Sequence, residues 1–491
     1  MLYWDKLLVP NRFRSTPSVT ASRSDTRSPF KKDFDTVCNS TILRRLQDKA
    51  QVFPLEQEDY ARTRLTHSIE VMSIAESLGM QAKSIILKDL EKHLSERYSK
   101  KDLSTIKQHI ENIPIILGTA ALLHDMGNPP FGHLGEQIIG DWFRDNLPKL
   151  MKKADGSYAF KDVGEVESTL SYKLKGSWAQ DLIHFDGNAQ LLRLVTKLNY
   201  VVDEHGMNLT FPVIATFIKY PCSSMNIKKK VLSKKKIGYF TAEKNEFEKI
   251  TNTLGIVGCR YPLAFLLEAA DDIAYLTADI EDAQKKGIVS LDCFETYLKR
   301  NEKDEIIAKV LLEIQKYREV AKKSKYPDVD DYVIRRIRIF IKGIMIDAMF
   351  DSFSNAYDDI MNGQCEEELI NLSSVATLAH TLRCIERDKI YYCDSIVKNK
   401  TRAFRIIQKL LEAYVPAVLN YKNVDSGKDT AENILYLSFS ENYRYICEQA
   451  NKGINSDETT LLYNRLLLVT DQISGMTDSR AMSIYQMLSA N

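Results

Sequence analysis

A His-Asp pair closes the most apolar segment of this 491-residue chain. His124 and Asp125 end residues 113–125, which are apolar on nearly every helical face and therefore predict a central, buried helix. Pro129 and Pro130 then stop the helix. Burying a carboxylate costs several kcal/mol unless an opposite charge pairs with it. A divalent cation is such a partner, so the pair predicts a metal site at the end of this helix.

Further metal ligands are found in two other segments. His67 begins a segment whose apolar residues face inward, although a lone histidine there is more often a core residue. Asp271 lies in an apolar helical pattern and shares one stripe with Tyr275 and Asp279, at four-residue spacing. Asp272 points about 100° away from that stripe. The spacing favours Asp271 as a ligand, and the alternative for Asp272 is a structural ion pair.

Two imidazoles and two carboxylates form a mixed donor set. Such a set suits Mn²⁺, Mg²⁺ or Co²⁺, and also Fe or Ni, better than metals that prefer thiolates. A bound cation of this kind activates a water molecule and polarises a phosphoryl oxygen. The residues by themselves thus indicate metal-assisted hydrolysis of a phosphoester.

The elements that must position these residues are predicted to be helices. Apolar side chains recur at helical spacing after residue 66, and a second long pattern over 263–286 ends at Gly287, which is typical of a helix C-terminus. Charged amphipathic patterns predict further helices at 304–323, 333–353, 401–414 and 458–468. A weak β signal at 234–241 predicts a minor β-hairpin. We therefore expect a mostly α fold.

The amino-acid composition excludes few classes of binding partner, because positive and negative charges are nearly balanced. Lys plus Arg number 67 and Asp plus Glu 66, so attraction for phosphate must come from local clusters. None of the eight cysteines forms a C-x-x-C pair, which is typical of reduced thiols in a reducing compartment. Residues 1–30 contain no apolar signal segment, and no run is long enough to span a membrane. We expect a cytoplasmic protein with no membrane partner.

Two polar stretches have open interpretations. Residues 12–32 are rich in Ser, Thr and Arg and predict an extended arm or a disordered tail. Residues 223–236 carry six lysines, which indicate either a solvated loop or contact with phosphate or nucleic acid.

Seven segments resemble the bacterial deoxyguanosinetriphosphate triphosphohydrolase (dGTPase) family of the HD-domain superfamily. The H…HD…D order of the four ligand residues is that of the superfamily as a whole. The family segments are RRLQDKAQVFPL at 44–55, RTRLTHS at 62–68, HDMGNPPFGHLGE at 124–136, FDGNAQ at 185–190, IKYP at 218–221, EAADDIAYLTAD at 268–279 and ISGMTD at 473–478. They cover nearly the whole chain, so a chance match is very improbable.

The resemblance implies a role for each matching residue. The metal ligands would be His67, His124, Asp125 and Asp271. His133 and Glu136 match the catalytic His-acid pair, and their i, i+3 spacing lets the carboxylate orient and charge the imidazole. Residues matching the substrate pocket are Gln51, Arg64, Asn188, Lys219, Tyr220, Lys236, Tyr275 and Asp279.

Within that pocket, Gln51 and Asp279 match residues that sit against the sugar 3′-OH. Tyr275 would lie near the deoxyribose and leave little room for a 2′-OH. Arg64, Lys219, Tyr220 and Lys236 match positions that hold the triphosphate.

The implied reaction converts a dNTP, with dGTP the foremost candidate, to deoxynucleoside plus inorganic triphosphate. Water activated by the metal would attack the α-phosphorus, and His133 would transfer a proton at either the O5′ leaving group or the attacking water. Base specificity stays open. The resemblance also implies a homo-oligomer, with a hexamer as the example.

Two other functions stay open. A different HD phosphohydrolase, a nucleotidase or phosphodiesterase, would use the same four ligands. A nucleotide-sensing or single-stranded-DNA-binding protein with an inactive HD pocket would account for the lysine run. For domains, we expect an N-terminal arm at 1–32, an HD catalytic core with insertions at 33–290, and a C-terminal helical region at 291–491 packed on that core.

Overall fold

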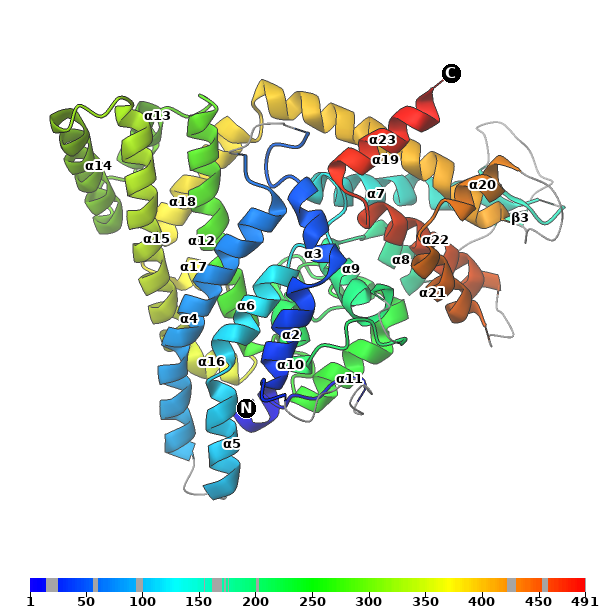
Figure 1. The fold of residues 1–491 in the computed structure, drawn as a ribbon, viewed down its shortest axis with the longest axis horizontal. Coiled ribbons are helices and arrows are strands. Elements are labelled where there is room, and N and C mark those ends of the chain that lie inside the picture. Colours follow the sequence, from blue (N-terminus) through cyan, green and yellow to red (C-terminus); the bar gives the residue numbers. More distant parts are fainter. Residues whose placement is uncertain are drawn as a thin grey trace.

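Helix α6 (Ile113–Leu123) is the buried centre of the fold, as its apolar sequence predicts. It packs along α4 (Arg64–His93) and also contacts α2 (Pro29–Cys38) and α10 (Phe211–Phe217). In Figure 1, α4 and α6 lie side by side through the middle of the molecule. The C-terminal end of α6 therefore lies in the interior of the protein, and His124 is the next residue.

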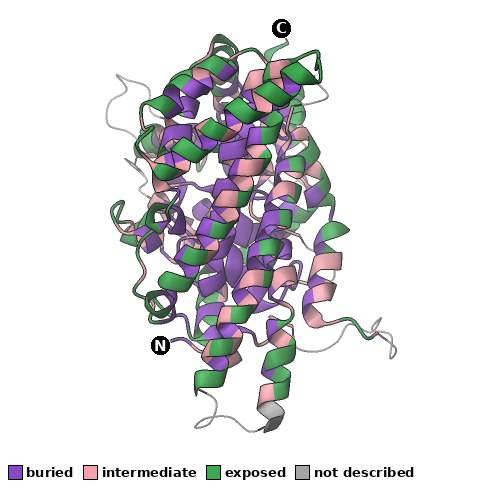
Figure 2. Ribbon diagram, turned by 90° about the vertical axis from the view of Figure 1, so that its left-hand side faces the viewer, coloured by how far each residue is buried: buried purple, intermediate pink, exposed green. Residues whose placement is uncertain are grey.

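The protein is described from a computed structural model. It defines residues 1–14, 25–55, 61–93, 100–153, 155–160, 170–171, 174, 176–199, 203–421, 430–452 and 458–490. In these ranges nearly all regular structure is helical, which confirms the predicted mostly α fold. Figure 2 shows buried residues gathered in the middle of the molecule and exposed residues on the outward faces of the surrounding helices.

A layer of long helices lies on one side of α6. Helix α12 (Pro262–Lys285) packs against both α4 and α15 (Val329–Asn355), and α14 (Glu305–Lys323) covers α15. Gly287 follows α12 with a positive φ of 69°, which ends the helix at the predicted place. The layer holds α12, with its acidic residues, against α4.

The C-terminal helices cover α7 (Gly132–Asn146). Helix α19 (Asp394–Asn420) packs on α7 and is itself covered by α20 (Ala431–Leu437), α22 (Glu458–Ser474) and α23 (Asp478–Ser489). This arrangement is visible in the upper right of Figure 1. Apolar residues from both sides of residue 290 form one continuous core, and the division at that residue stays a prediction.

The remaining described helices have at most 11 residues. They are α1 (Trp4–Leu7), α3 (Thr41–Arg45), α5 (Lys100–Ile110), α8 (Ser177–Ile183), α9 (Gly187–Arg193), α11 (Lys244–Leu254), α13 (Leu291–Lys299), α16 (Tyr357–Met361), α17 (Leu369–Leu372), α18 (Ala376–Ile385) and α21 (Glu441–Asn451). Within the described ranges, none of the helices is both long and apolar enough to cross a membrane.

The small β-sheet lies elsewhere than predicted. Strand β1 (Leu150–Lys152) pairs antiparallel with β2 (Tyr158–Phe160) and with β3 (Leu170–Ser171). The predicted strand at 234–241 is wrong, because this region consists of 3₁₀ turns and loop. Gly238 explains the loop: its N–H donates to the Cys222 carbonyl at 2.9 Å, and a Cβ there would lie 1.6 Å from the Tyr220 carbonyl oxygen.

The N-terminus is anchored to the core. The Trp4 indole donates to the Tyr357 hydroxyl at 2.7 Å, and the Tyr261 hydroxyl donates to the Leu7 carbonyl at 2.7 Å. Helix α2 begins at Pro29, inside the stretch predicted as an arm, because Ser28 caps it. Residues 15–24 of that stretch lie outside the described residues.

Candidate active site

Three helices bring the predicted metal ligands together. His67 comes from the first turns of α4, His124 and Asp125 follow α6, and Asp271 lies on α12. The possible ligand atoms of His67, His124 and Asp125 all lie within 4.8 Å of one another. His67 Nε2 lies 3.1 Å from Asp271 Oδ1, and His124 Nε2 lies 3.6 Å from the same oxygen. The four residues thus converge on one point.

The chemistry of His124 fits a metal ligand. Its Nδ1 lies 2.6 Å from the Ala121 carbonyl, which only accepts hydrogen bonds, so Nδ1 carries the proton. Nε2 faces the carboxylates, 3.7 Å from Asp125 Oδ2 and 3.6 Å from Asp271 Oδ1, and this buried nitrogen has no hydrogen-bond partner. An orphaned buried nitrogen between two acids is where a cation would be satisfied. The cluster is compatible with a divalent metal.

The charges in the cluster depend strongly on one another. Burial opposes ionisation of His124, but the Asp125 and Asp271 carboxylates raise its pKa to about 9. Burial also opposes ionisation of Asp271, yet Lys219 and His124 hold the pKa of this carboxyl well below its usual range. Lys219 Nζ lies 3.1 Å from Asp271 Oδ2. In the absence of a metal, the positive charges of Lys219 and His124 offset the negative charges of the Asp125 and Asp271 carboxylates.

Arg64 and Asn128 fix the orientation of Asp125. Arg64 Nη1 donates to Asp125 Oδ2 at 2.7 Å, and Asn128 Nδ2 donates to Oδ1 at 2.6 Å. Gly132 has a φ of +57°, and a Cβ on it would lie 2.1 Å from Arg64 Nη2. The turn before α7 therefore needs glycine at this position, both for its backbone and for the approach of Arg64.

That turn places His133 and Glu136 on the first turn of α7. His133 Nδ1 lies 2.8 Å from Glu136 Oε2, while the N–H of Gly187 donates to Glu136 Oε1 at 2.7 Å. Glu136 is buried, but 75% of the His133 side-chain surface is exposed. The Glu136 carboxylate raises the pKa of His133. The acid is thus held in place while the imidazole reaches solvent.

A cleft with a volume of about 810 Å³ joins the two groups of residues. His67, Asp125, Asp271 and His133 all line it. Six of the predicted substrate residues also line it: Gln51, Arg64, Lys219, Tyr220, Tyr275 and Asp279. The buried Gln51 Oε1 has no hydrogen-bond partner, so it is free to accept one from a ligand. The cleft thus combines acids, cations and an unpaired acceptor.

Two predicted substrate residues lie away from the described cleft lining. Lys236 Nζ contacts Asp186 Oδ2 at 2.8 Å and Glu136 Oε2 at 3.8 Å. Asn188 donates its backbone and side-chain N–H groups to Asp186 Oδ1. Both residues support the region behind Glu136 here, and their contact with substrate stays a prediction.

The C-terminal half supplies cleft residues that sequence reasoning missed. Arg383 Nη2 lies 3.3 Å from Asp272 Oδ1, and its Nε donates to the Tyr275 hydroxyl at 3.2 Å. Asp272 thus makes the ion pair that was the alternative to a ligand role, and the absence of a ligand role stays a prediction. Other missed lining residues are Glu368, Glu386, Tyr391 and Lys400.

Glu386 has the most unusual environment of these missed residues. It begins a π-helical turn (Glu386–Ile390) after α18, and its buried Oε1 has no hydrogen-bond partner. Burial and the nearby Asp279 raise the pKa of Glu386, while burial and Asp282 raise that of Asp279. In the sequence, the feature that could have indicated Glu386 as a site residue is its three-residue spacing from Arg383 within an apolar pattern.

This fold and cluster define an HD-domain protein, and residues 64–171 match the HD domain family. The chain is 41% identical over 489 residues to a deoxyguanosinetriphosphate triphosphohydrolase-like protein of Listeria monocytogenes, covering 99% of each chain. It is 30% identical to a deoxyguanosinetriphosphate triphosphohydrolase of Klebsiella pneumoniae, covering 99% of this chain and 98% of the other. The chain therefore belongs to the deoxyguanosinetriphosphate triphosphohydrolase-like family, as its motifs predicted.

Proposed function

We propose that this protein hydrolyses a dNTP, with dGTP the foremost candidate, to deoxynucleoside and inorganic triphosphate. The observation that carries the proposal is the shared cleft. His67, Asp125 and Asp271 line it, His124 lies beside them in the same cluster, and the exposed imidazole of His133 lines it as well. The names of the Listeria and Klebsiella relatives support the choice of nucleotide.

In the proposed reaction, one water molecule adds to the α-phosphorus and the bond from this phosphorus to O5′ breaks. A divalent metal, held by the four ligands, would supply Lewis-acid polarisation and lower the pKa of water. Arg64 and Lys219 would offset the negative charge of the polyphosphate, because both line the cleft beside the acids. These two cations are paired with Asp125 and Asp271 in the structure.

His133 would transfer the proton that this reaction requires. Its ring is accessible to the cleft, and Glu136 both orients it and stabilises its protonated form. Transfer to O5′ and transfer from the attacking water are both consistent with this placement. The pH dependence of kcat/KM distinguishes these two directions of proton transfer.

Sugar selection is proposed to depend on α12. Tyr275 and Asp279 line the cleft from this helix, and Gln51 lines it from the segment before α4. A polar and aromatic wall of this kind would hold the 3′-OH and leave little room for a 2′-OH.

The lysines of residues 223–236 lie in two different environments, the exposed surface and the region of the cleft. Lys228, Lys229 and Lys230 are exposed, whereas Lys235 lines the cleft and Lys236 contacts Asp186. Contact of the exposed lysines with single-stranded DNA stays a prediction, as do a homo-oligomeric state and a cytoplasmic location.

The direct test is separation of products by anion exchange after incubation with each dNTP and with GTP, in Mn²⁺ or Mg²⁺. We expect deoxynucleoside and inorganic triphosphate from dGTP, and much less product from GTP. Release of orthophosphate or a nucleoside monophosphate would favour another HD phosphohydrolase. Absence of turnover with all nucleotides and both metals would contradict the proposal.

A further inference from the structure

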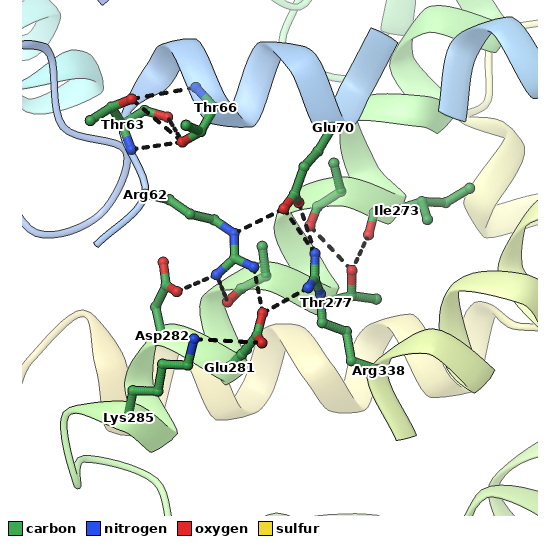
Figure 3. A network of polar contacts seen from close by, with 12 residues as sticks. Arg62, Thr63, Thr66, Glu70, Ile273, Thr277, Glu281, Asp282, Lys285 and Arg338 are labelled. Carbon is green, nitrogen blue, oxygen red and sulfur yellow. Dashed lines mark hydrogen bonds and ion pairs between the residues drawn. The ribbon is translucent and has the colours of Figure 1, made fainter. Parts of the chain in front are cut away.

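Arg62 lies outside the cleft lining and connects two of the segments that form the walls of the cleft. It precedes α4, and its guanidinium contacts Glu70 of α4 at 3.2 Å together with Glu281 and Asp282 of α12. Figure 3 shows the Arg62 side chain reaching from the segment before α4 to these acids on α12. Its side chain is 12% exposed, and those of Glu281 and Asp282 are more deeply buried.

The backbone on either side of Arg62 carries cleft residues. The Arg62 carbonyl accepts from the N–H of Gln51 at 3.4 Å, and the N–H of Arg64 donates to the Lys49 carbonyl at 2.8 Å. These bonds flank an antiparallel bridge between Ala50 and Thr63. Because Gln51 and Arg64 both line the cleft, a shift of this short ladder would move both of them.

The acids that hold Arg62 lie next to the cleft residues of α12. Arg62 Nη1 also donates to the Ala278 carbonyl at 3.4 Å, one residue before Asp279. Helix α12 carries Asp271, Tyr275 and Asp279 on its cleft side. The Arg62 guanidinium thus connects the Gln51–Arg64 wall to the α12 wall without lining the cleft itself.

We infer that Arg62 is a positioning residue, which sets the separation of these two walls and so controls binding of the nucleotide. This inference rests on the proposed nucleotide cleft. A guanidinium suits the role because its planar fork contacts several acids at once, whereas a lysine offers one point charge. Arg62 engages three carboxylates on two helices, so its loss would free both walls.

Arg338 provides a matched control within the same network. It extends from α15 and contacts Glu70 at 2.9 Å and Glu281 at 2.7 Å, as Figure 3 also shows. Within the described residues, Arg338 thus shares two acids with Arg62, but α15, which carries it, contributes no residue to the cleft lining. A purely structural network would make the two arginines equivalent. A positioning role makes Arg62 alone important for binding.

The test measures the dissociation constant of dGTP by equilibrium dialysis with Mn²⁺, in a His133→Ala background that prevents turnover. We expect Arg62→Gln to weaken dGTP binding about tenfold or more, and Arg62→Lys to restore part of the loss. Arg338→Gln should leave the dissociation constant within about twofold, even where it lowers the melting temperature. With His133 intact, Arg62→Gln should raise KM by a larger factor than it lowers kcat.

Three results would overturn the inference: unchanged dGTP binding in Arg62→Gln, equal weakening in Arg338→Gln, or no dGTP binding by the parent protein. If Arg62→Gln does not fold, Arg62→Lys is compared with Arg338→Lys at matched melting temperature. A wild-type protein that binds dGTP without hydrolysing it would contradict the proposed function alone, because the binding measurement still tests Arg62.

Discussion

The Glu136 carboxylate is held by the backbone N–H of Gly187, at 2.7 Å, in a space that admits no side chain. A Cβ on Gly187 would lie 2.1 Å from Asn128 Oδ1 and 2.8 Å from Glu136 Oε1. Asn128 in turn orients Asp125. This one glycine therefore supports both the proposed proton-transfer pair and the metal cluster.

Replacing Gly187 by alanine should lower kcat/KM for dGTP by about tenfold or more, because the added methyl group displaces Asn128 and Glu136. The matched control is Gly343→Ala in α15, where a Cβ would meet no atom within 4 Å. That change should leave activity intact and stabilise the helix by roughly 0.5–1 kcal/mol. Steady-state kinetics and thermal denaturation check both variants. Full activity in Gly187→Ala would contradict the account of this glycine.

The pH dependence of activity should reveal the role of His133. The Glu136 carboxylate raises the pKa of His133, so Glu136→Gln should lower that pKa and move the His133-dependent limb to lower pH. If the imidazole accepts a proton from water, the acidic limb moves. If the imidazolium donates to O5′, the alkaline limb moves.

The measurement is kcat/KM for dGTP from pH 5 to about 10. Glu111→Gln serves as control, since Glu111 is an exposed partner of Lys83 and lies before α6, at the opposite end of that helix from His124. An unchanged profile in Glu136→Gln, or a shift to higher pH, would show that this carboxylate does not set the charge of His133.

Asp271 and Asp272 form a matched pair for the metal prediction. Asp271 faces His67 and His124, whereas its neighbour pairs with Arg383. We expect Asp271→Asn to reduce Mn²⁺ affinity by more than about 100-fold, the upper range for second-shell changes, while Asp272→Asn keeps its metal. Metal analysis and the rise in melting temperature on adding Mn²⁺ provide readouts independent of activity. Equal retention of Mn²⁺ by both variants would remove Asp271 from the ligand set.

Residues that stand in family motifs or share a local helical pattern were predictable, even where they meet across the sequence, as His67 and Asp271 do, and contacts made by residues outside those motifs were not. The apolar run before His124 indicated a buried helix end, and the four-residue spacing of Asp271, Tyr275 and Asp279 indicated one face of α12. Arg383 instead meets Asp272 across 111 positions of sequence. Its role depends on how α18 packs against α12, which no local pattern encodes.

The misplaced β-strand has a similar cause. Tyr239 and Phe240 after Gly238 have the residue types of a strand. In the fold, Phe240 is buried as part of a loop, because Gly238 packs against the carbonyl of Tyr220. A tertiary contact decides the backbone conformation here.

Breaking the buried ion-pair network around Arg193 should be costly to stability. Arg193 Nη2 contacts Asp471 at 2.7 Å and Nη1 contacts Glu243 at 2.8 Å, and all three residues are buried. Arg193→Met should lower the free energy of unfolding by about 3–5 kcal/mol, because Asp471 loses its cationic partner in the interior and Glu243 keeps only Lys197, at 3.3 Å. The exposed pair of Arg144 and Asp141 is the control, and Arg144→Met should cost at most about 1 kcal/mol. Urea denaturation followed by circular dichroism compares them, and equal losses would contradict the argument from burial.

Tyr275 should determine discrimination against ribonucleotides. It lies on α12 between Asp271 and Asp279, and its hydroxyl accepts a hydrogen bond from Arg383 Nε at 3.2 Å. Arg383 therefore fixes the ring at the cleft wall, where it would exclude a 2′-OH.

Tyr275→Ala should raise kcat/KM for GTP relative to dGTP by about tenfold, since steric selection by a pocket wall has roughly this size. Tyr275→Phe keeps the ring and loses only the hydroxyl, so it should retain most of the preference for dGTP. Competition between the two nucleotides in one reaction measures the ratio directly. If Tyr275→Phe and Tyr275→Ala accept GTP equally well, the hydroxyl and its bond to Arg383 select the sugar, and exclusion by the ring is wrong.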